Sequence, residues 1–174
     1  MKDEISYIEL VNELKDPSKP LFGGSLAYMT IETNICLLIK LLDIKIAKNS
    51  DDKSSLVKVR AIASSLLPFS HEMITKDGLI FDKLRSTKDP IEKDKIVNEI
   101  FYPSYAYIDN LSTLTFYIDR IITITKGTLK HDFAMISDVI ESCKRNLISI
   151  LRYEVKKLSD DLKKQEYLDI INEL

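Results

Sequence analysis

Apolar residues recur at intervals of three and four along most of the chain, which is the period of one face of an α-helix. Three stretches show this spacing most clearly: Val59, Ile62, Leu66, Phe69 and Met73; Tyr107, Leu111, Leu114, Ile118 and Ile121; and Phe133, Ile136, Ile140, Cys143, Leu147 and Ile150. No alternation of strand period competes with them over a useful length. Apolar seams of this kind, joined by short loops, are typical of antiparallel helix bundles.

Glycine and proline separate these helical stretches. We expect helices over about residues 4–14, 25–47, 54–85 and 91–126, a fifth from about residue 131, and a short one over 160–172. Ser25 is expected to cap the second helix and Gly127 to close the fourth. Pro68 and Pro103 predict kinks in the third and fourth helices. The predicted fold is all-α: an antiparallel up-and-down bundle of five long helices plus a short C-terminal helix.

Length and composition narrow the class of protein. The 174 residues suit one domain, and 25 basic against 27 acidic residues give no electrostatic reason to expect nucleic acid as a partner. Cys36 and Cys143 stand in apolar helical contexts, as reduced core cysteines do. The sequence shows no secretory stretch, and its longest apolar run, 35–42, is too short to span a bilayer. We therefore expect a cytoplasmic protein without membrane or metal, since two histidines are too few for a histidine-rich metal site.

The corner formed by Gly23, Gly24 and Ser25 is the first candidate for chemistry. Adjacent glycines let a backbone approach a ligand closely. The helix that follows offers free N–H groups and a positive dipole end, which suit a carboxylate or a phosphate. A tight turn between helices with a serine cap accounts for the same three residues, so both interpretations stay open.

Three further polar positions are not explained by a bundle core. Asp77 and Phe81 lie one turn apart on one helix face, and a carboxylate beside a ring can act as a general base or hold a cationic heterocycle. Asp132, near a helix start, and Asn146, beside an apolar seam, can hold a ligand. The alternatives are an exposed aspartate beside Lys76, electrostatic capping by Asp132, and a contact of Asn146 with a neighbouring helix.

In their order and spacing these residues resemble the formiminotransferase-cyclodeaminase-like family, which includes methenyltetrahydrofolate cyclohydrolases. Members have a Pro-Gly-Gly-Gly-Ser type corner, an aspartate followed four residues later by phenylalanine, a helical proline, a Ser-Asp pair and a later asparagine. The corresponding stretches here are 21–25, 77–81, 102–104, 131–132 and 145–147, within a match over about residues 7–155. The chain departs from this pattern at Phe22, at the bulky residues 28–32, at His131 and at Ile150.

The resemblance implies a single cyclodeaminase-like helical domain over residues 1–174, a homodimer, and a reduced folate carrying a one-carbon unit as substrate. No cofactor or metal is needed. The reaction is either cyclisation of 5-formiminotetrahydrofolate with release of ammonia or hydrolysis of 5,10-methenyltetrahydrofolate to 10-formyltetrahydrofolate. The implied catalytic residue is Asp77, and the implied substrate-binding residues are Gly23, Gly24, Ser25, Phe81, Asp132 and Asn146. Because the departures reshape the pocket, a non-catalytic relative acting as a ligand-binding or oligomerisation bundle is the second hypothesis.

Overall fold

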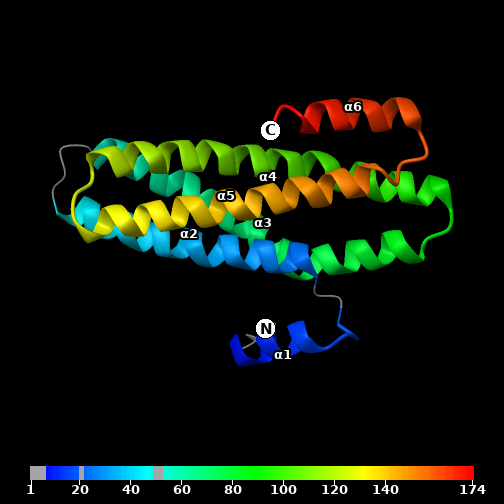
Figure 1. The fold of residues 1–174 in the computed structure, drawn as a ribbon, viewed down its shortest axis with the longest axis horizontal. Coiled ribbons are helices and arrows are strands. Elements are labelled where there is room, and N and C mark those ends of the chain that lie inside the picture. Colours follow the sequence, from blue (N-terminus) through cyan, green and yellow to red (C-terminus); the bar gives the residue numbers. More distant parts are fainter. Residues whose placement is uncertain (1–6, 20–21, 49–52) are drawn as a thin grey trace.

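The computed structural model describes residues 7–19, 22–48 and 53–174, and it confirms the all-α prediction. Within these residues there are six helices and no strand: α1 (Tyr7–Lys15), α2 (Gly23–Ala47), α3 (Lys53–Ser86), α4 (Pro90–Ile124), α5 (Thr128–Val155) and α6 (Asp161–Ile171). The four long helices run side by side and antiparallel, joined at the ends of the bundle, whereas α1 lies outside it (Figure 1).

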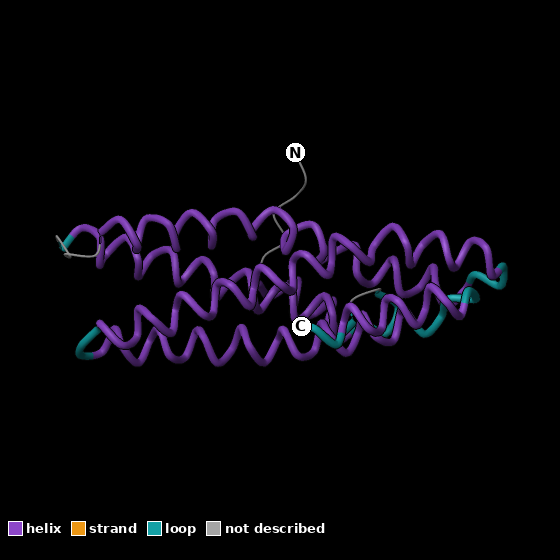
Figure 2. The backbone as a smooth tube through the Cα atoms, turned by 90° about the horizontal axis from the view of Figure 1, so that it is seen from above, coloured by secondary structure: helices purple, strands orange, loops and turns teal. Residues whose placement is uncertain are grey.

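The core lies between α2, α3, α4 and α5. Helix α2 packs along both α3 and α5, and α4 packs along α5 and over a shorter stretch along α3. The tube view shows the same arrangement from above (Figure 2). The seams expected from the sequence face inward, and their fully buried members include Leu111, Leu114, Ile118, Phe133, Ile136 and Ile140. Burying such side chains is the main stabilising contribution in a bundle of this size.

Helix α2 is long and apolar enough, by length and composition alone, to cross a membrane. In the bundle it contacts α3 on one side and α5 on the other, and Ile31, Ile35, Leu38 and Leu42 are fully buried. The core helix of a soluble protein meets the same criterion of length and composition.

The cap predicted for α2 is wrong. The helix begins at Gly23, Phe22 is its N-cap residue, and no side chain of the cap makes a hydrogen bond. Ser25 is the third residue of the helix, and its buried hydroxyl has no hydrogen-bond partner among the described residues. The physical reason is a competing acceptor from another helix, Asp77, which takes the Ser25 backbone N–H.

The expectation that Gly127 closes the fourth helix is also wrong. Helix α4 ends at Ile124, and Gly127 is the N-cap residue of α5 with φ 71°, a left-handed conformation that favours glycine. Helices α3 and α4 also continue through Pro68 and Pro103, so neither proline ends a helix. A proline inside a long helix is tolerated where packing on both sides holds the helix together.

The short helix α6 folds back onto the bundle. The Tyr167 ring stacks on Phe101 with centroids 3.7 Å apart, and the Tyr167 hydroxyl donates to Asn98 Oδ1 at 3.1 Å. The turn before α6 is held by Ser159, whose backbone N–H and hydroxyl both donate to the Asp94 carboxylate. These contacts fix the C-terminal end of α5, where the candidate site lies.

Candidate functional site

Asp77 of α3 caps the N-terminus of α2 from outside that helix. It is 7 % exposed, and its Oδ2 accepts the backbone N–H of Ser25 at 3.1 Å. The first N–H groups of any α-helix lack partners within the helix, and the helix dipole is positive there. A carboxylate at this place therefore satisfies a donor and interacts favourably with the dipole.

The two glycines at this corner have different roles. A Cβ atom on Gly24 would lie less than 3.0 Å from the Asp77 carboxylate, a separation that real Cβ atoms essentially never show. Gly24 is therefore what allows Asp77 to approach α2. At Gly23 a Cβ would meet no atom within 4 Å, so the Gly23 backbone borders open space.

Gly23 also borders a pocket of about 260 Å³, which we call the ring pocket. Its lining consists of Gly23, Gly24, Asp77, three aromatic side chains (Phe22, Phe81 and Tyr153), and Ser149, Ile150 and Glu154. The Phe22 and Phe81 rings are 4.9 Å apart between centroids, and Phe81 and Tyr153 are 6.3 Å apart. Aromatic faces attract cations and stack on flat rings, so this lining favours a planar ligand with positive charge.

Glu154 of α5 is the member of the ring pocket that the sequence interpretation missed. It is 6 % exposed, and burial together with the nearby negative charge of Asp77 raises its pKa to about 8. Burial also raises the pKa of Asp77, while the Ser25 N–H bond acts in the opposite direction. At neutral pH the pocket thus holds a protonated carboxyl group on Glu154 beside Asp77, which suits proton transfer.

A sequence signal for Glu154 did exist. It lies seven residues after Leu147, which is fully within the apolar seam, so two helical turns bring it to the same buried face of α5. A charged residue in register with a buried seam is rare unless it is paired or functional.

The two carboxyl groups also border a second, much smaller cavity lined by core residues such as Ile108 and Leu147. Its volume is about 10 Å³, close to the lower limit for a single water, and its polar lining includes Tyr28, Asp77, Ser104 and Glu154. Burial, and the charges of Asp77 and Glu154, raise the pKa of the Tyr28 hydroxyl. A polar layer therefore extends from the ring pocket across the bundle core.

The structure brings only part of the predicted site together. Gly23, Gly24, Asp77 and Phe81 all line the ring pocket. Ser25 contributes its backbone N–H to Asp77. The remaining two predicted residues do not line the pocket.

Asn146 is exposed on α5, one turn before Ser149 of the ring pocket. Asp132 is half-buried near the start of α5, 22 residues before Glu154, which corresponds to roughly 33 Å along a helix. Asp132 is therefore too far along α5 to contact a ligand that also contacts Asp77 in the same protomer.

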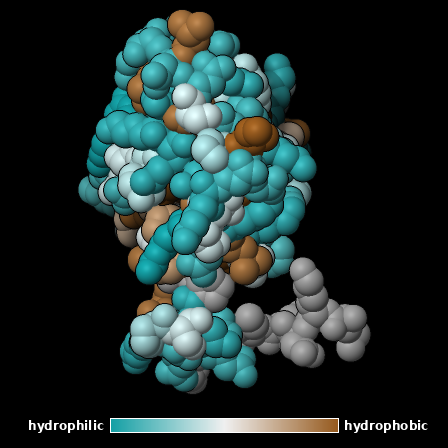
Figure 3. Space-filling model, turned by 90° about the vertical axis from the view of Figure 1, so that its right-hand side faces the viewer, coloured by the Kyte–Doolittle hydropathy of each residue, from teal (hydrophilic) through white to brown (hydrophobic). Residues whose placement is uncertain are grey.

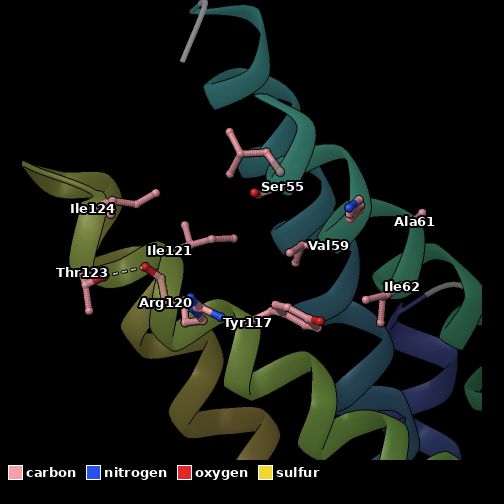
Figure 4. A pocket seen from close by; sticks show the side chains of 11 residues that line it. Ser55, Val59, Ala61, Ile62, Tyr117, Arg120, Ile121, Thr123 and Ile124 are labelled. Carbon is pink, nitrogen blue, oxygen red and sulfur yellow. Dashed lines mark hydrogen bonds between the residues drawn. The ribbon is translucent and has the colours of Figure 1, made fainter. Parts of the chain in front are cut away.

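A larger cavity of about 650 Å³ lies between the start of α3 and the end of α4 (Figure 4). Ile121 of α4 and Val59 of α3 point toward each other across it, and Arg120 and Tyr117 lie along its α4 wall (Figure 4). No acidic residue lines this groove, and it shares no residue with the ring pocket. It therefore lacks a carboxyl group, whereas the ring pocket holds two buried ones, and for this reason the ring pocket is the candidate site.

Among the described residues, no group of three or more histidine, cysteine, aspartate or glutamate side chains is placed to hold a metal ion. Comparisons of the chain with family models, with curated proteins and with solved structures find no match.

Proposed function

We propose that the chain is a folate-dependent one-carbon enzyme, and that the ring pocket is its active site. The substrate is a reduced folate carrying a one-carbon unit. The reaction is cyclisation of 5-formiminotetrahydrofolate with release of ammonia, or hydrolysis of 5,10-methenyltetrahydrofolate to 10-formyltetrahydrofolate. The observation that carries the proposal is the buried pair Asp77 and Glu154, which lines the ring pocket beside the N-terminus of α2 together with three aromatic side chains.

The charge of the ring pocket suits this substrate class. The methenyl compound is a flat cation, and rings such as Phe22 and Phe81 attract a cation through their faces. The Asp77 carboxylate adds a negative charge at low exposure, where an electrostatic interaction is stronger than in water. Both effects stabilise an amidinium centre and the related transition state.

Each reaction needs one group that accepts a proton and one that donates a proton. In hydrolysis, water adds to the methenyl carbon and one of its protons passes to Asp77. The carbon–N5 bond then breaks as N5 takes a proton from Glu154, and the hydroxyl proton passes to the Glu154 carboxylate as the N10-formyl group forms. In cyclisation, N10 attacks the formimino carbon; the formimino nitrogen gains the proton lost by N10 and a second one from Glu154, and leaves as ammonia. Asp77 is the proposed acceptor, and Glu154 is the proposed donor because its raised pKa keeps it protonated near pH 7.

The loss of methenyl absorbance tests the proposal. The wild type should accelerate hydrolysis, and Asp77→Asn should lower the rate by about 10²–10⁴-fold, the usual contribution of a general base. Asn keeps an oxygen for the Ser25 N–H, so the fold is retained. Asp82→Asn, at an exposed position of the same helix, is the control and should leave the rate unchanged.

Equal rates for the wild type and Asp77→Asn would remove Asp77 from this role. Binding of the methenyl compound without any turnover would favour the second hypothesis, a ligand-binding relative, which the Phe22–Phe81 contact over the pocket also suits. The homodimer implied by the resemblance and the cytoplasmic location expected from the sequence stay predictions.

A further inference from the structure

A second cavity adjoins the ring pocket and has the opposite charge. It has a volume of about 160 Å³ and is lined by Phe81, Leu84, Arg85, Lys93, Tyr153 and Lys157. Phe81 and Tyr153 also line the ring pocket, so the two cavities share an aromatic wall. We call this second space the cationic cavity.

The three basic residues of the cationic cavity come from different parts of the fold. Arg85 is in the last turn of α3, Lys93 is near the start of α4, and Lys157 follows the end of α5. Their convergence depends on the packing of three helices, so a run of basic residues in the sequence does not reveal it. No acidic side chain lines the cavity.

These cations have no carboxylate partner among the residues that the structure describes. The neighbouring Lys83, by contrast, pairs with Glu92 at 3.1 Å. Lys157 Nζ lies over the Tyr153 ring, 4.3 Å from its centroid, which directs the ammonium group to the wall shared with the ring pocket. Like charges brought together without a counter-ion repel one another, and a bound anion relieves that repulsion.

The surroundings favour a local anion site over a broad basic surface. The chain has a net charge of −2. The end of the bundle where α3 meets α4 is largely hydrophilic with a few isolated apolar side chains (Figure 3). The hydrophilic surface does not match a membrane, which needs a larger apolar face, and the net charge of −2 does not favour an extended nucleic acid.

We propose that the cationic cavity is an anion-binding subsite, and that the ligand of this protein carries an arm with carboxylate or phosphate groups that binds Arg85, Lys93 and Lys157 while its planar ring occupies the ring pocket. The shared aromatic wall is what joins the two parts. The placement of the ring rests on the proposed function. The anion subsite itself depends only on the three unpaired cations and the space between them.

Two small anions test the subsite directly. Citrate and tripolyphosphate are titrated into the wild type by calorimetry at low ionic strength, and whichever binds more tightly identifies carboxylate or phosphate as the preferred group. Each of Arg85→Gln, Lys93→Gln and Lys157→Gln should weaken the tighter anion about two- to five-fold, the range for partly exposed ion pairs. The triple variant should weaken it at least tenfold. Added salt should also weaken binding.

Lys156→Gln is the matched control, because Lys156 is exposed, adjoins Lys157 and does not line the cavity. It should leave the affinity unchanged. A wild type that binds neither anion overturns the subsite, and so does a loss of affinity in Lys156→Gln as large as that in Lys157→Gln, because the effect would then come from general surface charge.

A ligand with and without the arm separates this inference from the proposed function. 5,10-Methenyltetrahydrofolate ends in the two carboxylates of its glutamate, whereas the primary amide of 5,10-methenyltetrahydropteroic acid has no carboxylate. The subsite predicts that Lys157→Gln weakens the first and not the second. If both compounds bind and neither responds to the three substitutions, the subsite is wrong and the proposed function stands. If neither compound binds while the small anions bind the three cations, the subsite stands and the folate proposal falls.

Discussion

Replacing Gly24 by alanine tests the contact on which the candidate site depends. The added methyl group would lie less than 3.0 Å from the Asp77 carboxylate. Either Asp77 or the start of α2 must move, and the bond from the Ser25 N–H to Asp77 is then lost or lengthened. Gly23→Ala is the matched substitution, because its methyl group meets no atom within 4 Å.

The expected magnitude follows from two destabilising contributions and one that opposes them. Overpacking at a buried site costs about 1–3 kcal/mol, and loss of a hydrogen bond to a charged group costs about 1.5–3 kcal/mol. Alanine offsets up to about 1 kcal/mol of this through its higher helix propensity. We expect Gly24→Ala to lower the free energy of unfolding by about 2 kcal/mol, which corresponds to roughly 4–8 °C in Tm for a chain of this length. Gly23→Ala should leave stability unchanged or raise it slightly.

Chemical denaturation of four proteins completes the test: the wild type, Gly24→Ala, Asp77→Ala and the double variant. Since Asp77→Ala removes the carboxylate that the new methyl group meets, Gly24→Ala should cost almost nothing in that background. The coupling free energy should be about 2 kcal/mol, as for residues in direct contact. Additive losses in the double variant would show that Asp77 does not pack against Gly24, and the reasoning would be refuted.

Three further predictions address the cap, the buried acid and the last helix. Ser25→Ala should change the free energy of unfolding by less than about 0.5 kcal/mol in a denaturant melt, because its hydroxyl has no partner among the described residues; a loss of about 1 kcal/mol would instead indicate a serine cap. Glu154 keeps its proton in the folded state up to about pH 8 but loses it near pH 4.5 when the chain is unfolded. The free energy of unfolding should therefore fall as pH rises between these values, by at most about 1.4 kcal/mol per pH unit. Glu154→Gln should remove that slope, and an identical slope in both proteins would contradict the raised pKa. Tyr167→Ala should lower the free energy of unfolding by about 3–5 kcal/mol, because it removes a fully packed ring from Phe101; a change below 1 kcal/mol would mean that α6 is not docked as described.

The helices were predictable from the sequence because their apolar seams are long and regular. Positions such as Leu111, Ile118 and Ile140 recur at helical spacing and are fully buried. The N-terminus of α2 was less predictable. Ser25 has the residue type of a local cap, but the helix begins two residues before it. The Asp77 carboxylate, 52 residues away, accepts a first-turn N–H in place of a capping side chain, and this contact forms only when α2 packs on α3.

The part of the candidate site formed by the start of α2 and the neighbouring helix α3 was predictable from the sequence. Gly23, Gly24, Asp77 and Phe81 meet because α2 and α3 are extensively packed. Glu154 was missed because the apolar seam was followed only as far as Ile150, one helical turn before it. Asp132 was grouped with Asp77 by order along the chain, but α5 separates it from the ring pocket by most of its length.

Calorimetric titration with 5,10-methenyltetrahydrofolate tests the central claim, that the ring pocket binds a flat cation of this class. Gly23→Val is the informative variant, because Gly23 lines the ring pocket and a Cβ atom there makes no contact within 4 Å outside its chain neighbours and its own helix. Ala61→Val, in the groove between α3 and α4, is the control. We predict binding by the wild type and by Ala61→Val, and a loss of at least tenfold in affinity for Gly23→Val. The absence of heat with the wild type at high micromolar ligand, or equal affinity in all three proteins, would contradict the claim.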